Sequence, residues 1–147
     1  MGIEKVRAYT LVSIQAVCIV LILATGRPFA GSVLPLSFQV AGILLGIWAV
    51  AVMGIGNTNV SPRVKPDAQL ITKGPYALIR HPMYSAVLLA VWPLIVDHCS
   101  LLRLGAGLIL TADLIVKTLY EESLLRKHFA GYETYMKKTK RLIPFVL

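Results

Sequence analysis

Cysteine is scarce in this sequence, and its placement excludes two kinds of site. The 147 residues hold only Cys18 and Cys99, with no CxxC spacing, so the sequence predicts neither a disulfide framework nor a zinc site. The three histidines form no HExxH pattern, and the GxGxxG motif of dinucleotide-binding proteins is missing. We therefore expect no bound metal, and the sequence disfavours a dinucleotide.

Acidic residues are also few, and long stretches carry no charge at all. Seven aspartates and glutamates stand against fifteen lysines and arginines, which gives a net charge of +8. Residues 8–26 are uncharged, as is every residue between Arg27 and Arg63. With 56% hydrophobic residues and a mean hydropathy of +0.72, the chain is too apolar for a soluble domain. We expect residues 1–147 to form a single membrane domain.

The apolar blocks predict an all-α, polytopic membrane protein with about four transmembrane helices. Roughly 20 apolar residues cross a hydrocarbon core about 30 Å thick. Segments 8–26 and 35–55 reach that length. Segments 83–96 and 104–120 are shorter, and they predict a helical hairpin with its turn near residues 97–103.

This pattern divides the chain into four parts and suggests their orientation. They are two N-terminal spans in residues 1–56, a loop in 57–82, the hairpin in 83–120 and an amphipathic C-terminal cap in 121–147. We expect the first span to be retained, because its apolar core is long and no convincing cleavage site precedes Arg27. Lysine and arginine concentrate before the first span, in the loop and after the fourth span, while the opposite side has only Arg27 and Arg103. The positive-inside rule then places both termini and the loop in the cytoplasm.

The densest polar chemistry lies in GPYALIRHPMYS, residues 74–85. Gly74 and the proline after it indicate a turn. Pro82 keeps His81 out of the helical conformation and suits the first position of the third helix. The first free amides of that helix, next to Arg80 and His81, are therefore expected to form an anion site.

Tyrosines surround this stretch. Tyr76 and Tyr84 flank the expected anion site, and five of the six tyrosines follow residue 75. They could belong to the interfacial aromatic belt of a membrane protein. Their clustering with Arg80 and His81 favours a cofactor pocket instead.

The fourth predicted helix contains a second group of charged residues. Asp113, Lys117 and Glu121 recur every four residues on one face. Charges inside a span cost about 2.5–3.5 kcal/mol each, so they usually face the protein interior and have a function. The alternative is an i,i+4 ion pair near the interface.

Glu121 and Glu122 are adjacent carboxylates at the end of this helix. They would bind a sulfonium, an ammonium or the hydroxyl groups of a ribose, unless Arg126 alone balances their charge.

A basic amphipathic stretch follows. Leu125, Phe129, Tyr132 and Met136 form one helical stripe, and Gly131 is expected to break or bend it. Such a stretch is expected to lie on the membrane surface. There it would cover the site formed by the other two elements.

These motifs together resemble the membrane methyltransferases of the isoprenylcysteine carboxyl methyltransferase and phospholipid methyltransferase group. The resemblance rests on GPYALIRHPMYS, then EESLLRKHF, then YETYMKKTKRLIP, and it covers about residues 67–145. It implies S-adenosylmethionine as cofactor, bound at the cytoplasmic face. Carried over residue by residue, the cofactor contacts would be Ala68, Gln69, Leu70, Ile71, Tyr76, His81, Pro82, Met83, Tyr84 and Glu121.

One departure from the isoprenylcysteine enzymes concerns the acceptor. Where they have an arginine one turn before the first glutamate, this chain has Lys117, which lacks the two-pronged fork that matches a carboxylate. Arg141 could supply that fork. Lys117, Arg141 and Glu122 are the candidate catalytic residues. The chain is short, so a lipid-facing tunnel would be small or shared with a second copy in a homo-oligomer.

The expected reaction is methyl transfer to a lipid-like or prenylated acceptor, and the partners expected are membrane lipids rather than nucleic acid. A carboxylate acceptor needs no base, whereas an amine must lose a proton, for which Glu122, His128 or Asp113 could serve. Three functions from other classes stay open. One is a non-catalytic membrane scaffold, and another is a small four-helix transporter that would depend on Asp113. The third is a membrane reductase that uses a dinucleotide, which the missing GxGxxG motif disfavours.

Overall fold

The computed structural model describes residues 3–54 and 69–143. Within these residues the regular secondary structure is helical. The β-type backbone pairing among them is one isolated parallel bridge between Ile79 and Lys140. Part of the predicted loop lies outside the described residues, including Ala68 and two of the basic residues that predict orientation, Arg63 and Lys65.

Two helices among the described residues are long and apolar enough to cross a membrane. They are α1 (Ile3–Ala24) and α2 (Val33–Met53), and both were predicted. Helix α1 begins earlier than expected, because Lys5 and Arg7 continue it beyond the apolar block. The guanidinium of Arg7 then lies 4.7 Å from the centre of the Tyr120 ring on another helix.

The predicted hairpin is formed by α3 (Pro82–Asp97) and α4 (Leu101–His128). Its turn is shorter than expected, because the Ser100 side chain accepts a hydrogen bond from the Arg103 amide at 3.3 Å and restarts the helix. Helix α4 also runs well past residue 120, so that the acidic pair lies within it. At 16 residues α3 is a short apolar helix, and α4 has several charged residues along its length.

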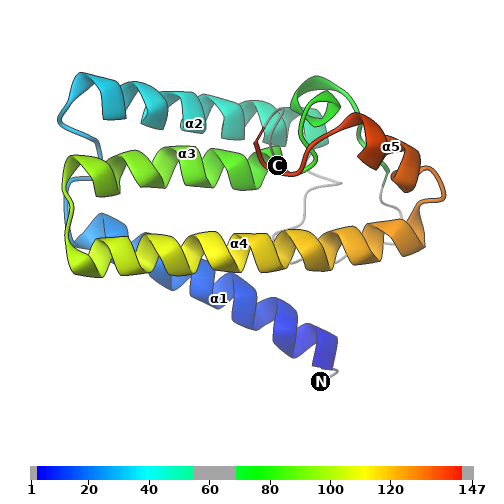
Figure 1. The fold of residues 1–147 in the computed structure, drawn as a ribbon, viewed down its shortest axis with the longest axis horizontal. Coiled ribbons are helices and arrows are strands. Elements are labelled where there is room, and N and C mark those ends of the chain that lie inside the picture. The colour runs from blue at the N-terminus through cyan, green and yellow to red at the C-terminus, as the bar shows by residue number, and fades with distance from the viewer. Residues whose placement is uncertain (1–2, 55–68, 144–147) are drawn as a thin grey trace.

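The four long helices pack in pairs (Figure 1). Helix α2 packs along α3, and α1 packs along α4. The interaction of α2 and α3 depends on Gly42, where an added Cβ would lie 2.6 Å from the Ala90 amide nitrogen. The core between α1, α3 and α4 is apolar and consists of Cys18, Ile22, Ala30, Val91, Leu94, Ile95, Ala106, Leu110 and Leu114.

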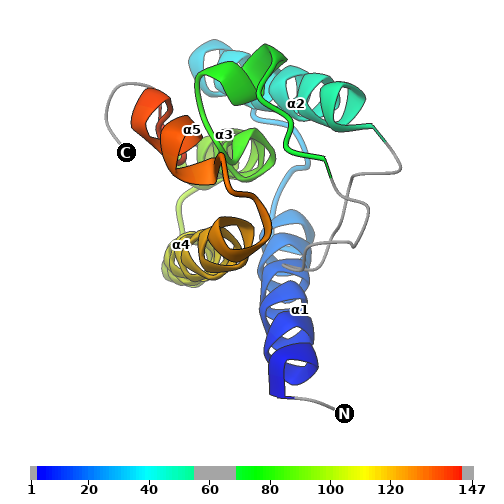
Figure 2. The same cartoon turned by 90° about the vertical axis from the view of Figure 1, so that its right-hand side faces the viewer.

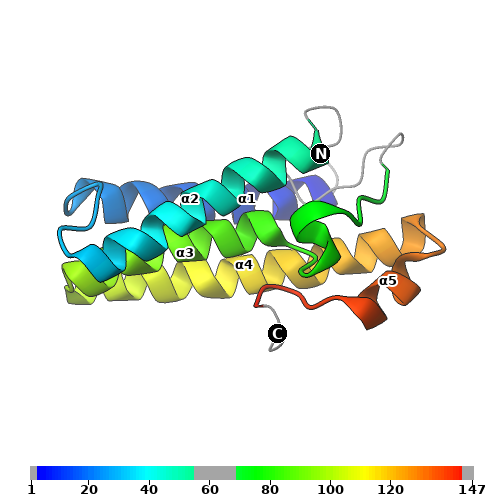
Figure 3. The ribbon, with the colours of Figure 1, turned by 90° about the horizontal axis from the view of Figure 1, so that it is seen from above.

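The two ends of this bundle are closed differently. At one end the Asp97 carboxylate accepts hydrogen bonds from the Gly31 and Ser32 amides, at 2.7 and 3.0 Å, and so connects the end of α3 to the residues just before α2. At the other end α5 (Tyr132–Lys138) turns back after α4, toward the short 3₁₀ helix η1 (Gly74–Ala77) (Figures 2 and 3). The predicted break between α4 and α5 is found, with Gly131 at the start of α5.

Candidate functional site

The start of α3 and the last third of α4 meet at the end of the bundle that α5 covers. His81 precedes α3 with φ −123° and ψ 58°, and Pro82 is the first residue of the helix, as predicted. The Tyr84 hydroxyl donates to Glu121 Oε1 at 2.6 Å, and His81 Nδ1 lies 3.4 Å from Glu121 Oε2. The structure therefore brings together the residues that the sequence placed in two separate motifs.

Glu122 is the most heavily paired carboxylate of this group. Arg80 Nε donates to its Oε1 at 2.7 Å, and Arg141 Nε donates to its Oε2 at 3.0 Å. The side chain of Glu122 is only 3% exposed. Burial alone raises the pKa of Glu122, but His81, Arg80 and Arg141 outweigh it and lower the pKa to about 2. Glu122 is therefore ionised at neutral pH and is a weak base.

His81 lies between the two acidic side chains. Its Nε2 is 3.6 Å from Glu122 Oε1, which is too far for a hydrogen bond, and its ring stacks on Tyr84 with centroids 5.6 Å apart. Burial alone lowers the pKa of His81, but the carboxylates of Glu121 and Glu122 raise it above its ordinary value. The imidazole therefore favours its charged form more than an isolated histidine does.

A segment that follows α5 crosses the start of α3. The Arg80 amide donates to the Lys140 carbonyl at 2.7 Å, and the His81 amide donates to the Arg141 carbonyl at 3.0 Å. Arg80 also donates through Nη1 to the carbonyl oxygen of Thr139. Residues 139–142 thus form a clasp over the beginning of α3, and Arg141 joins this clasp to Glu122.

The expected anion site at the start of α3 is reduced by these contacts. Pro82 has no amide hydrogen, and the amides of Tyr84 and Ser85 both donate to the His81 carbonyl, at 3.1 Å each. The clasp takes the amides of Arg80 and His81. Much of the backbone donor capacity that the sequence indicated is therefore used within the chain, and the Arg80 side chain is only 7% exposed.

Three tyrosines of η1 and α5, the elements next to the site, are buried. The Tyr135 hydroxyl donates to the Tyr76 carbonyl at 2.6 Å, and burial raises the pKa of Tyr135 to about 12, so it remains a donor. Tyr76 is 3% exposed. Tyr132 is 1% exposed, and within the described residues its hydroxyl has no hydrogen-bond partner.

The other residues carried over from the resemblance lie at varied depths. Gln69 is exposed, Leu70 and Ile71 are half-buried, Pro82 is buried and Met83 is half-buried. None of these has an ionisable side chain. Their proximity to a cofactor stays a prediction.

Lys117 lies deeper in the bundle, with partners that the sequence did not indicate. Its Nζ donates to Gln15 Oε1 on α1 at 2.5 Å and lies 5.0 Å from the centre of the Tyr84 ring. Asp113 is 5% exposed, and neither carboxylate oxygen has a hydrogen-bond partner among the described residues. The i,i+4 ion pair is therefore not formed. Gln15 was missed, although a single amide side chain within an apolar span is itself a signal.

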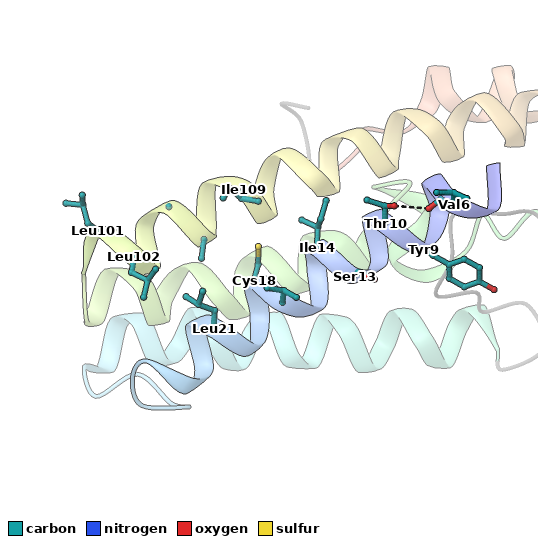
Figure 4. A pocket seen from close by; sticks show the side chains of 13 residues that line it. Val6, Tyr9, Thr10, Ser13, Ile14, Cys18, Leu21, Leu101, Leu102 and Ile109 are labelled. Atoms are coloured by element: carbon teal, nitrogen blue, oxygen red, sulfur yellow. Dashed lines mark hydrogen bonds between the residues drawn. The ribbon is translucent and has the colours of Figure 1, made fainter. Parts of the chain in front are cut away.

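An apolar groove of about 750 Å³ runs between α1 and α4 (Figure 4). It shares no residue with the cluster around Glu121 and Glu122. Its lining residues are Val6, Tyr9, Thr10, Ser13, Ile14, Val17, Cys18 and Leu21 from α1, and Leu101, Leu102, Gly105, Ala106 and Ile109 from α4.

Comparison with known proteins identifies one family. The sequence model described as phospholipid methyltransferase matches residues 30–131. This range includes α2, which precedes the residues that carry the resemblance, together with α3 and α4. It ends before the clasp. No individual curated protein matches the chain.

Proposed function

The chain belongs to the phospholipid methyltransferase family, and from this membership we propose that it transfers a methyl group from S-adenosylmethionine to a lipid-like or prenylated acceptor at the cytoplasmic face of a membrane. Membership implies a methyltransferase that acts on lipid-like substrates. The cofactor, the membrane face and the acceptor are the proposed part. The main support for this proposal is the contact between the start of α3 and Glu121, because this contact joins the two motifs of the resemblance in one site.

The residues at this contact fit the cofactor's polar groups. Glu121 is 19% exposed in its side chain, against 3% for Glu122, so Glu121 can accept hydrogen bonds from a ribose or an amino group. The buried Tyr132 hydroxyl and His81 Nε2 lack partners within the described chain and could serve a bound ligand. Arg141, with a side chain 36% exposed, fits an anionic carboxylate better than the occupied amides of α3 do.

Glu122 has a positioning role in this proposal. It holds Arg80 and Arg141, and these two arginines connect α3 and the clasp to α4. Tyr84 and His81 hold Glu121 in turn. The result is a site whose geometry is fixed by paired charges before any ligand arrives.

The bound cofactor would supply a methyl group on sulfur, so that a bond from the acceptor nitrogen or oxygen to the methyl carbon forms while the carbon–sulfur bond breaks and its electron pair stays on sulfur. The chain's own residues hold the two reactants in line and keep water out.

We also propose that α1 to α4 all cross the membrane, with both termini cytoplasmic. Arg7 packs on Tyr120 near the end of the bundle where the basic residues of α5 lie. Arg27 and Arg103 lie toward the other end. This distribution agrees with the positive-inside rule.

The test is incubation of the purified protein with radiolabelled S-adenosylmethionine and either membrane lipids or prenylated thiols. Calorimetry in detergent measures cofactor binding separately. We expect Glu121→Ala and His81→Ala to weaken binding at least about tenfold, the loss expected for a hydrogen bond to a charged group. Glu133→Ala, an exposed carboxylate on α5, is the control and should bind normally. Absence of binding by the unmodified protein would refute the proposal.

A further inference from the structure

Helix α1 ends before residue 30, where the match to the family begins, yet one of its side chains reaches a buried charge. Gln15 is the only amide side chain in α1. Its Oε1 accepts a hydrogen bond from Lys117 Nζ on α4 at 2.5 Å. Lys117 is 1% exposed, so a residue of α1 holds this ammonium inside the bundle. Such hydrogen bonds between helices are common in membrane proteins.

The same ammonium contacts the site around Glu121. Lys117 Nζ lies 5.0 Å from the centre of the Tyr84 ring, within the range of a cation–π interaction. The Tyr84 hydroxyl donates to Glu121 Oε1 at 2.6 Å, and its ring stacks on His81. Tyr84 therefore connects Lys117 to the two residues that we propose as cofactor contacts.

Gln15 decides where the ammonium of Lys117 lies. Residues four positions apart on a helix are neighbours, so Asp113 and Glu121 each lie one turn from Lys117. Neither carboxylate accepts a hydrogen bond from this ammonium among the described residues. Without the Gln15 oxygen, the ammonium would move toward one of these carboxylates, because opposite charges attract strongly in an apolar environment. It would then leave the ring of Tyr84.

We propose that Gln15 is a positioning residue of the cofactor site. It holds the Lys117 ammonium over the Tyr84 ring, and this contact keeps the Tyr84 hydroxyl directed at Glu121. The inference rests on the proposed methyl transfer and adds α1 to the elements that serve it. Lys117 then acts through Tyr84 as a second positioning residue, and not by contact with the acceptor.

The first test measures the affinity for S-adenosylmethionine by calorimetry in an uncharged detergent. Gln15→Leu should weaken binding about fivefold, because Glu121 is no longer held in a fixed position. Gln15→Glu keeps an oxygen that can accept from Lys117, and it should bind as the unmodified protein does. Thr10→Val is the control on the same helix, since the Thr10 hydroxyl donates to the Val6 carbonyl of α1 itself. It should also bind normally.

A hydrogen bond that only joined α1 to α4 would give a different result. It would lower the stability of Gln15→Leu and leave its affinity for the cofactor unchanged, which would overturn the proposal. The route is tested by Lys117→Met. In that background Gln15→Leu should cause no further loss of affinity, because no ammonium is left to hold. A further fivefold loss would show that Gln15 does not act through Lys117.

The second test needs no cofactor. Unfolding in mixed micelles, titrated with sodium dodecyl sulfate, is compared for Gln15→Leu, for Tyr84→Phe, which keeps the ring and removes the hydroxyl, and for both together. We expect a departure from additivity of at least about twofold in the unfolding equilibrium constant, which disappears when Lys117→Met is present. Additive effects would overturn the proposal. Failure of the proposed methyl transfer would instead appear as absent cofactor binding by the unmodified protein, which leaves this comparison unaffected.

Discussion

Glu122 gives the most direct test of how the site is held together. Glu122→Gln removes the charge that Arg80 and Arg141 share and leaves Arg80 buried without a counter-ion. The lowering of the Glu122 pKa from 4.5 to about 2 corresponds to about 3 kcal/mol in favour of the folded state. Removal of one partner from a buried ion pair costs about 3–5 kcal/mol. We therefore expect the variant to lose about 3 kcal/mol of unfolding free energy.

The pH dependence of this difference has a defined sign. Because the folded pKa of Glu122 is lowered, its contribution is complete above pH 4.5 and is lost as the pH falls toward 2. Unfolding of the purified protein and the variant in mixed micelles, titrated with sodium dodecyl sulfate, measures the difference at neutral pH. Thermal unfolding in uncharged micelles follows it from pH 7 to pH 3. The two proteins should approach each other in stability at the acidic end.

A matched control separates this effect from the loss of any carboxylate. Glu133 is exposed on α5, and Glu133→Gln should change the unfolding free energy by less than about 0.5 kcal/mol at all pH values. If Glu122→Gln is as stable as the Glu133 variant, the paired arginines do not hold the site, and our account of its geometry is wrong.

Three further predictions concern the rest of the fold. Gly42→Ala should destabilise the protein by about 1–3 kcal/mol in the same micelle titration, because its Cβ meets backbone at 2.6 Å, whereas Gly46→Ala meets only a methyl group at 3.4 Å and should be tolerated. Asp97→Ala should speed hydrogen exchange of the Gly31 and Ser32 amides just before α2, and unchanged rates would mean that this carboxylate does not bind them. Gln15→Leu should cost about 1–3 kcal/mol, and Lys117→Met added to it should restore part of that loss; simple additivity of the two would argue against their hydrogen bond.

Much of the architecture follows from local rules that the sequence carries. The all-helical fold and the two long apolar helices are confirmed, because uncharged blocks of about 20 residues have few alternatives in a membrane. Pro82 predicted the start of α3 correctly, because proline restricts its own backbone conformation and that of the residue before it. The end of α4 was placed too early, because the acidic and basic residues after residue 120 ended the apolar block without ending the helix.

The sequence predicted that the start of α3 and Glu121 lie together, but it did not predict the partners of the other charged residues. His81 and Glu121 were expected together because a known pattern contains both. The pairing of Glu122 with two arginines was not expected, because Arg80 and Arg141 lie 42 and 19 residues away in the sequence. Gln15 belongs to no recognised motif, and Lys117, its hydrogen-bond partner, is 102 residues away in the sequence. Contacts of this range depend on how helices pack, which local spacing does not specify.

The clasp formed by residues 139–142 also bears on how the protein is made. These residues follow every predicted span, so within the described chain they are synthesised after α1 to α4. Until then Glu122 lacks Arg141, and the amides of Arg80 and His81 have no acceptor. Within the described chain, the contacts that join the start of α3 to the clasp can therefore form only after its last residues have been synthesised.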